Sequence, residues 1–95
     1  MSAIEDHISK LGMTGQDRVS GVVGVITSVD FDLYGCIQYL ITPKAKETGE
    51  SVDSRWCDVT RIVVEDETRV MPMPDFDAGY IAEGKKGANT DKPAP

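Results

Sequence analysis

The chain has 95 residues, of which 40% are hydrophobic and 27% charged, and its formal net charge is −6 at pH 7. This length predicts one small domain with a modest core. No apolar run approaches the roughly 20 residues that a membrane-spanning helix needs, and Glu5, Asp6, His7 and Lys10 interrupt any apolar segment of a signal peptide. We therefore expect neither a membrane partner nor export.

The negative charge is spread along the chain, because each of the segments 1–16, 17–65 and 66–95 holds more Asp and Glu than Lys and Arg. Protein binding to nucleic acid depends mainly on basic side chains that neutralise phosphates. We therefore expect no nucleic acid among the partners.

Two cysteines, Cys36 and Cys57, fall within expected strands. Isolated thiols favour a reducing compartment, and we interpret both as small buried hydrophobic residues. The alternative is a disulfide between them, which requires that their Cα atoms come within about 7 Å. With one histidine and no CxxC pair, the sequence predicts no metal site.

The N-terminal segment predicts a short amphipathic helix over residues 3–11. Ser2 and Glu5 have capping-box spacing. Ile4, Ile8 and Leu11 recur at helical intervals, and Gly12 stands where a helix often ends. Residues 13–17 are interpreted as a linker.

The middle of the chain predicts a small antiparallel β-barrel of about five strands. Gly21 and Gly24 interrupt its first strand, as the bends of a small barrel require. The expected order is strand 18–29, acidic turn 30–35, strand 36–42, polar loop 44–53, strand 54–58, tight turn 59–61, strand 62–64 and a short edge strand at 68–71. In strand 36–42, Ile37, Tyr39 and Ile41 share one face.

Residues 72–95 are rich in proline, glycine, alanine and charge, and cannot build a core of their own. We expect an extended C-terminal arm that a partner or a neighbouring subunit holds in place. The predicted organisation is an N-terminal helix and linker over 1–16, a β-barrel over 17–71 and the arm over 72–95.

Catalytic chemistry is poorly supported, because a cysteine nucleophile would need a base and His7 on the helix is the only imidazole. We predict no enzyme and no cofactor. The candidate binding residues are Tyr34, Tyr39, Trp56, Asp58 and Arg61. Asp58 and Arg61 form, on one interpretation, an ion pair that pins the tight turn. On the other, Trp56 and Arg61 bind a stacked nucleotide or a peptide.

Three segments of the chain resemble a group of small, uncharacterised proteins of tailed bacteriophages and prophages. The shared pattern is V-x-G-x-x-G with a following Thr, Y-x-G-C-hydrophobic-Q-Y, and W-x-D-x-x-R. It falls here on Val19, Gly21, Gly24, Thr27, Tyr34, Gly35, Cys36, Gln38, Tyr39, Trp56, Asp58 and Arg61. The resemblance implies an SH3-like, or KOW-like, barrel.

The resemblance does not indicate an activity, and the long polar tail leads us to expect a non-enzymatic, phage-encoded interaction or assembly protein. It would bind phage structural proteins or further copies of itself, in the virion or during its assembly. An alternative is a host-takeover protein that sequesters a nucleotide signal or blocks a defence protein. The expected location is the host cytoplasm during infection, and the virion for a structural role.

Overall fold

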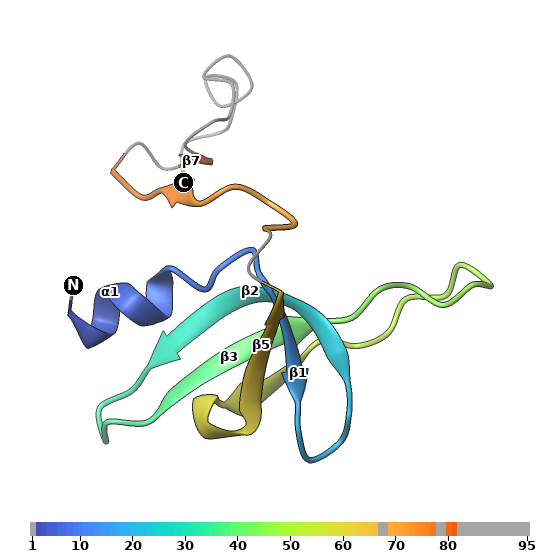
Figure 1. The fold of residues 1–95 in the computed structure, drawn as a ribbon, viewed down its shortest axis with the longest axis horizontal. Coiled ribbons are helices and arrows are strands. Elements are labelled where there is room, and N and C mark those ends of the chain that lie inside the picture. The colour runs from blue at the N-terminus through green and yellow to red at the C-terminus, as the bar shows by residue number, and fades with distance from the viewer. Residues whose placement is uncertain (1, 67–68, 78–79, 82–95) are drawn as a thin grey trace.

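The computed structural model describes residues 2–66, 69–77 and 80–81 (Figure 1). A short helix, α1 (Ala3–Ile8), precedes five strands of one sheet. The strands are β1 (Thr14–Asp17), β2 (Val23–Phe31), β3 (Ile37–Thr42), β4 (Arg55–Asp58) and β5 (Ile62–Asp66). A 3₁₀ turn, η1 (Val59–Arg61), joins the last two, and the two-residue strands β6 (Pro74–Asp75) and β7 (Tyr80–Ile81) follow. No helix in this described part is long and apolar enough to cross a bilayer.

The five-stranded sheet is antiparallel throughout, in the order β4-β3-β2-β1-β5. Its edge strands, β4 and β5, are consecutive in the chain and are joined by η1 alone. Five flat strands would set the two edges about 19 Å apart, whereas a 3₁₀ turn rises only about 2 Å per residue. The sheet is therefore strongly curled, as Figure 1 shows, and the predicted mainly β, antiparallel architecture is confirmed.

The alternation predicted for strand 36–42, which is β3 in the structure, is confirmed. Tyr39 and Ile41 of β3 are buried. They pack with residues of other elements in one apolar core, whose members are Leu11, Ile26, Tyr39, Ile41, Cys57 and Ile62. A β-bulge in β2 between Ile26 and Ser28 increases the local twist of the long β2–β3 hairpin.

The first strand lies earlier than the sequence predicted. Thr14–Asp17, expected as a linker, is β1, and residues 18–20 form a turn instead of opening a strand. The cause is the Asp17 side chain, which accepts hydrogen bonds from the Val19 N–H and the Ser20 hydroxyl and so turns the chain back. Gly21 completes the turn with a φ of +83°.

The helix is capped as expected but shorter. The Ser2 hydroxyl accepts from the Glu5 N–H and the Glu5 carboxylate accepts from the Ser2 N–H. The helix ends at Ile8, and tight turns with bonds from Lys10 to His7 and from Leu11 to Ile8 follow. These turns carry Leu11 into the core.

Residues 69–77, here called the strap, cross above β2 near the end of α1 (Figure 1). The Arg69 guanidinium donates to the carbonyl oxygens of Leu11 and Ser9, at 2.5 and 2.6 Å. The Val70 N–H donates to the Gly12 carbonyl at 2.7 Å. Residues 69–71 are held by these bonds and do not form the edge strand that the sequence predicted at 68–71. Residue 68 lies outside the described residues.

β6, which lies within the strap, pairs with β7 as a two-stranded antiparallel ribbon. The remainder of the predicted arm, residues 82–95, lies outside the described residues.

Candidate functional site

Arg61 bonds to Asp17 and not to Asp58, so the predicted Asp58–Arg61 ion pair is wrong. The Arg61 Nε and Nη2 atoms donate to the two oxygens of the Asp17 carboxylate, at 2.9 and 2.5 Å. Asp17 is only 1% exposed. Its hydrogen bonds with Arg61, and to a smaller extent the one with Ser20, hold the pKa of its carboxyl well below the usual range. The pKa of Arg61 is raised by the same bonds. Arg61 therefore ties η1 to the β1–β2 turn.

Asp58 has a local role as the N-cap of η1. Its Oδ1 atom accepts from both the N–H and the hydroxyl of Thr60, at 2.9 and 2.7 Å. These bonds, the hydroxyl first, lower the pKa of the Asp58 carboxyl. The tight turn predicted at 59–61 is confirmed. It is stabilised by the Asp58 cap and not by an ion pair between Asp58 and Arg61.

Tyr39 is an internal residue, 4% exposed. Its hydroxyl lies 2.8 Å from His7 Nδ1, and its ring meets the His7 ring edge-on at 5.8 Å between centroids. The Phe31 ring also meets the His7 ring edge-on, at 6.4 Å between centroids. Burial, with the nearby charge of Asp6, raises the pKa of Tyr39 to about 12. Tyr39 and His7 thus dock α1 on the sheet.

Replacing Tyr39 by phenylalanine is expected to lower the free energy of unfolding at pH 7 by about 1 kcal/mol, because the bond to His7 is lost. The pH dependence changes as well. The pKa of Tyr39 is about 12 in the folded chain and about 10 in an unfolded one, so its neutral form favours folding below pH 10. That contribution disappears as the pH rises from 10 through 12.

Urea unfolding between pH 9 and 11.5 measures this effect, and Tyr34→Phe is the matched control because its hydroxyl is on an exposed turn. The alkaline loss of stability should be smaller in Tyr39→Phe than in the natural chain and unchanged in Tyr34→Phe. Equal alkaline profiles for the three proteins would contradict the assignment.

Trp56 lies on the outward face of β4, about half exposed, opposite Leu40 of β3. A row of hydroxyls crosses the sheet beside it, with Thr27 to Thr42 at 2.8 Å and Thr42 to Ser54 at 3.0 Å. Of the five predicted binding residues, Trp56 and Tyr34 are exposed but on different elements. Tyr39, Asp58 and Arg61 make the internal contacts described above.

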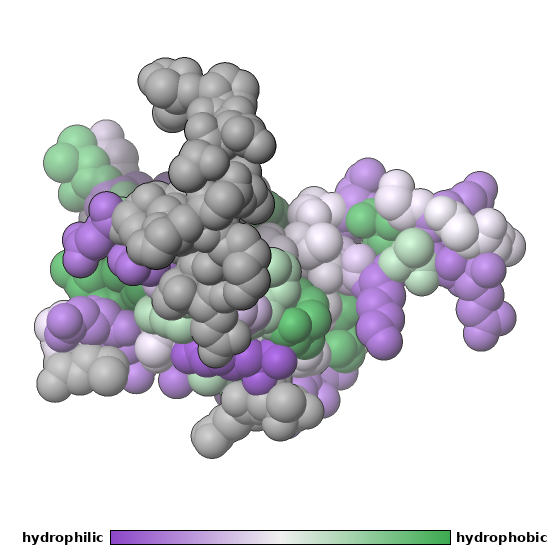
Figure 2. Space-filling view, turned by 90° about the horizontal axis from the view of Figure 1, so that it is seen from above, coloured by the Kyte–Doolittle hydropathy of each residue, from purple (hydrophilic) through white to green (hydrophobic). Residues whose placement is uncertain are grey.

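The turn between β2 and β3, residues 31–36, is here called the hairpin tip. Leu33 and Tyr34 on it are 90% and 85% exposed. The Asp32 Oδ1 atom accepts from the N–H groups of Tyr34 and Cys36, both at 2.9 Å, and Gly35 takes a φ of +87°. The tip therefore presents two large apolar side chains on a fixed backbone. Figure 2 shows hydrophobic surface at the end of the molecule where this hairpin and α1 lie.

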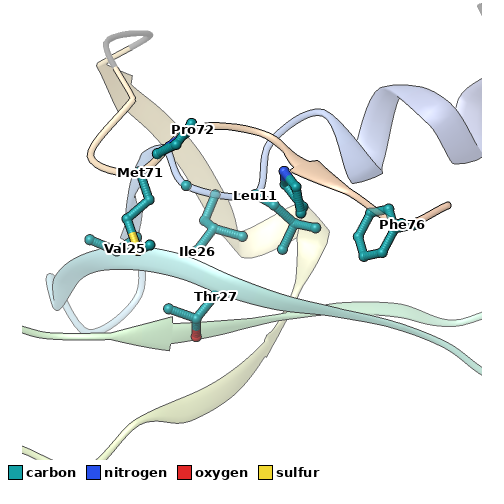
Figure 3. A pocket seen from close by; sticks show the side chains of 9 residues that line it. Leu11, Val25, Ile26, Thr27, Met71, Pro72 and Phe76 are labelled. Atoms are coloured by element: carbon teal, nitrogen blue, oxygen red, sulfur yellow. The ribbon is translucent and has the colours of Figure 1, made fainter. Parts of the chain in front are cut away.

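An apolar groove of about 370 Å³ opens between β2 and the strap, and is here called the strap groove. Its lining residues are Leu11, Gly12, Val25, Ile26, Thr27, Met71, Pro72, Pro74 and Phe76 (Figure 3). A second hollow shares Leu11, Thr27 and Phe76 with it and continues along β2 to Phe31. The volume lies at the lower end of the range for ligand sites.

Sequence reasoning missed the exposed hairpin tip, the strap groove and the Asp17–Arg61 pair. It identified the acidic turn but not that Leu33 would stand out from it. The strap groove requires residues 69–77 to fold back over β2, whereas they were expected to form an edge strand and an arm. The signal that was available is the spaced apolar set Met71, Met73 and Phe76 within a polar segment.

The cysteines do not pair. Cys57 is buried, as expected, whereas Cys36 is exposed on the hairpin tip, and both thiols are free. Burial raises the pKa of the Cys57 thiol, with the nearby Asp17 charge adding to the shift. In the described part of the chain, no three His, Cys, Asp or Glu side chains converge into a metal site.

We compared the chain with protein-family models, with curated proteins and with solved structures, and none of the three comparisons finds a match.

Proposed function

We propose that the chain is a non-enzymatic interaction module of a tailed bacteriophage, built on an SH3-like barrel, that acts in the virion or in its assembly. The fold part of this proposal is supported by a curled sheet whose edge strands are joined by one 3₁₀ turn. The phage part rests on the sequence resemblance.

The observation that carries the interaction role is the hairpin tip. Leu33 and Tyr34 are held out from the body by a turn whose backbone Asp32 fixes. A rigid apolar projection loses little conformational entropy on binding and buries its side chains in a partner. Tyrosine is among the residues that contribute most to protein interfaces.

The alternative is a host-takeover role. Trp56 favours it, because an exposed indole beside the hydroxyls of Thr42 and Ser54 offers a flat apolar surface and hydrogen-bond partners to a nucleotide or a peptide.

Mass spectrometry of purified particles separates the two roles. We expect the chain in the particles, or in their assembly intermediates, of the phage that encodes it. Leu33→Ser/Tyr34→Ser should deplete it there by roughly tenfold or more, as expected for the loss of an interface hot spot. The control is Val19→Ser, which changes an exposed side chain on another turn.

A chain absent from particles and intermediates, yet required for infection, would overturn the assembly role and favour host takeover. Normal incorporation of the Leu33→Ser/Tyr34→Ser variant would remove the hairpin tip from the proposal.

A further inference from the structure

We propose that the outer face of β2, β3 and β4 binds a cationic peptide segment, one of whose arginine or lysine side chains lies against Trp56 and between the carboxylates of Asp30 and Asp58. The inference deepens the alternative role proposed above, in which Trp56 binds a nucleotide or a peptide, by naming the charge of the ligand. Its test uses the purified chain and short peptides. It can therefore fail while the particle experiment succeeds, and the reverse.

Two rows of side chains that cross the three strands make up this outer face. The residues opposite one another are Asp30, Gln38 and Asp58 in one row, and Ser28, Leu40 and Trp56 in the next. Residues paired across strands share a face, as do residues two apart along a strand. Tyr39 and Cys57 alternate with these residues along β3 and β4 and are buried. The two rows therefore face outward.

The two carboxylates of the first row are available to a ligand. Asp30 is exposed, and neither Asp30 nor Asp58 forms an ion pair in the described part of the chain. The bonds from Thr60 occupy one oxygen of Asp58 and leave the other. The two rows themselves hold no lysine or arginine. A cation on this face would therefore meet negative charge that its neighbours do not neutralise.

The arginines at the two ends of β4 lie toward the core side of the strand. Burial is the main reason why the pKa of the Cys57 thiol is raised, and the charges of Arg61 and Arg55 act against that rise. Both guanidinium groups are thus near the buried thiol. Arg61 also lowers the pKa of Asp58, but less than the local hydrogen bonds do, and its Nε and Nη2 atoms donate to Asp17.

Trp56 supplies the apolar part of the site. Its side chain is 48% exposed and lies two positions before Asp58, about 7 Å along the strand. Asp30 and Asp58 are separated by one strand and hence by about 10 Å, with the Gln38 amide between them. A guanidinium group above Gln38 can reach both carboxylates, while its flat face or its stem packs against the indole.

The same charges disfavour a nucleotide on this face. A phosphate beside the indole would meet the two carboxylates on one side. On the other side it would meet the row of neutral hydroxyls formed by Thr27, Thr42 and Ser54. The lysines of the loop between β3 and β4 follow that row, and one of them, Lys46, is paired with Glu50. A cationic peptide is therefore the ligand that this face fits.

Fluorescence titration of the full chain tests the proposal, because Trp56 is the only tryptophan and its emission reports on the face directly. The probe is a blocked peptide of alternating glycine and arginine, which contains no aromatic residue. We expect a saturable change in the Trp56 emission. The same peptide with glutamate in place of arginine, and uridine monophosphate, should cause none.

Variants of the chain place the binding on this face. Asp30→Asn/Asp58→Asn should bind the arginine peptide about tenfold more weakly, because two exposed ion pairs are lost. The matched control is Glu47→Gln/Asp53→Asn, which removes two charges from an exposed loop and should leave the affinity within about twofold. Trp56→Leu, measured by calorimetry, should weaken binding about threefold. Circular dichroism and thermal unfolding check that each variant is folded.

Three outcomes would overturn the proposal. The arginine peptide could leave the Trp56 emission unchanged up to its solubility limit, which would mean that the face takes no cationic segment. The two double variants could weaken binding equally, which would assign it to the net charge of the chain and to no particular face. Uridine monophosphate could change the emission where the arginine peptide does not, which would identify the ligand as a nucleotide.

Discussion

The Asp17→Asn variant is expected to unfold at roughly half the urea concentration that the natural chain needs at pH 7. The reason is the number of donors that converge on this carboxylate. One oxygen accepts from Arg61 Nε and the Val19 N–H, and the other accepts from Arg61 Nη2 and the Ser20 hydroxyl. The Cys57 thiol lies near the second oxygen, at 3.9 Å.

Asparagine has the same shape but only one acceptor oxygen. In either orientation its amide nitrogen would face the Arg61 guanidinium, donor against donor, and in one of the two it would also face the Val19 N–H. The site is closed to water, because Asp17 is buried. Both the β1–β2 turn and the link between η1 and the sheet depend on this carboxylate. A chain of this length holds only roughly 5–15 kcal/mol of stability in total, so this single change is expected to remove a large part of it.

Asp58→Asn is the matched control, because it makes the same chemical change at a cap. One oxygen of Asp58 receives both bonds from Thr60, and asparagine caps a helix about as well as aspartate does. The control should therefore unfold near the natural midpoint. Equal midpoints for Asp17→Asn and Asp58→Asn would contradict the structural role given to Asp17.

The Asp17 carboxylate is also expected to make the fold sensitive to acid. Its pKa in the folded chain lies well below the usual value, chiefly through Arg61. In the unfolded chain it is near the ordinary value of about 4. The contribution to stability is therefore complete above pH 4 and is lost as the pH falls below 4 toward the folded pKa. Asp17→Asn lacks this group, so its stability should depend less steeply on pH between 4 and 2.

The sheet could be predicted from local signals because each signal acts within a few residues. The alternation of Ile37, Tyr39 and Ile41, the tight turn after Asp58 and the capping box at Ser2 are all set by near neighbours. The buried position of Tyr39 also follows from this alternation. Its partner, His7, does not, because the two residues are 32 positions apart and meet only when α1 lies on the sheet.

Asp17 was missed for a related reason. A charged residue between a glutamine and an arginine predicts a surface linker, and its burial depends on Arg61, which is 44 positions away. The strap groove likewise depends on Arg69 and Val70 bonding to residues near α1. Long-range polar contacts between single residues carry no periodic pattern, so a sequence alone gives no sign of them.

Replacing Gly12 by alanine is expected to lower the free energy of unfolding by about 3 kcal/mol or more and to release the strap. Gly12 has a φ of +90°, which residues with a side chain rarely adopt. A Cβ added there would also fall within van der Waals overlap of the Met71 carbonyl oxygen, at 2.4 Å. That oxygen belongs to the backbone, so the strap itself would have to move, and the bond from the Val70 N–H to the Gly12 carbonyl would lengthen.

Gly21→Ala separates the two causes. Gly21 has nearly the same φ, +83°, but nothing within 4 Å of an added Cβ, so its substitution should cost only the backbone strain of about 1–2 kcal/mol. The Val70 amide proton reports on the strap directly, since its hydrogen exchange should speed up in Gly12→Ala and stay slow in Gly21→Ala. Equal stability losses and unchanged Val70 exchange in both variants would mean that the strap does not rest on Gly12. In that case the groove beneath the strap would need another support.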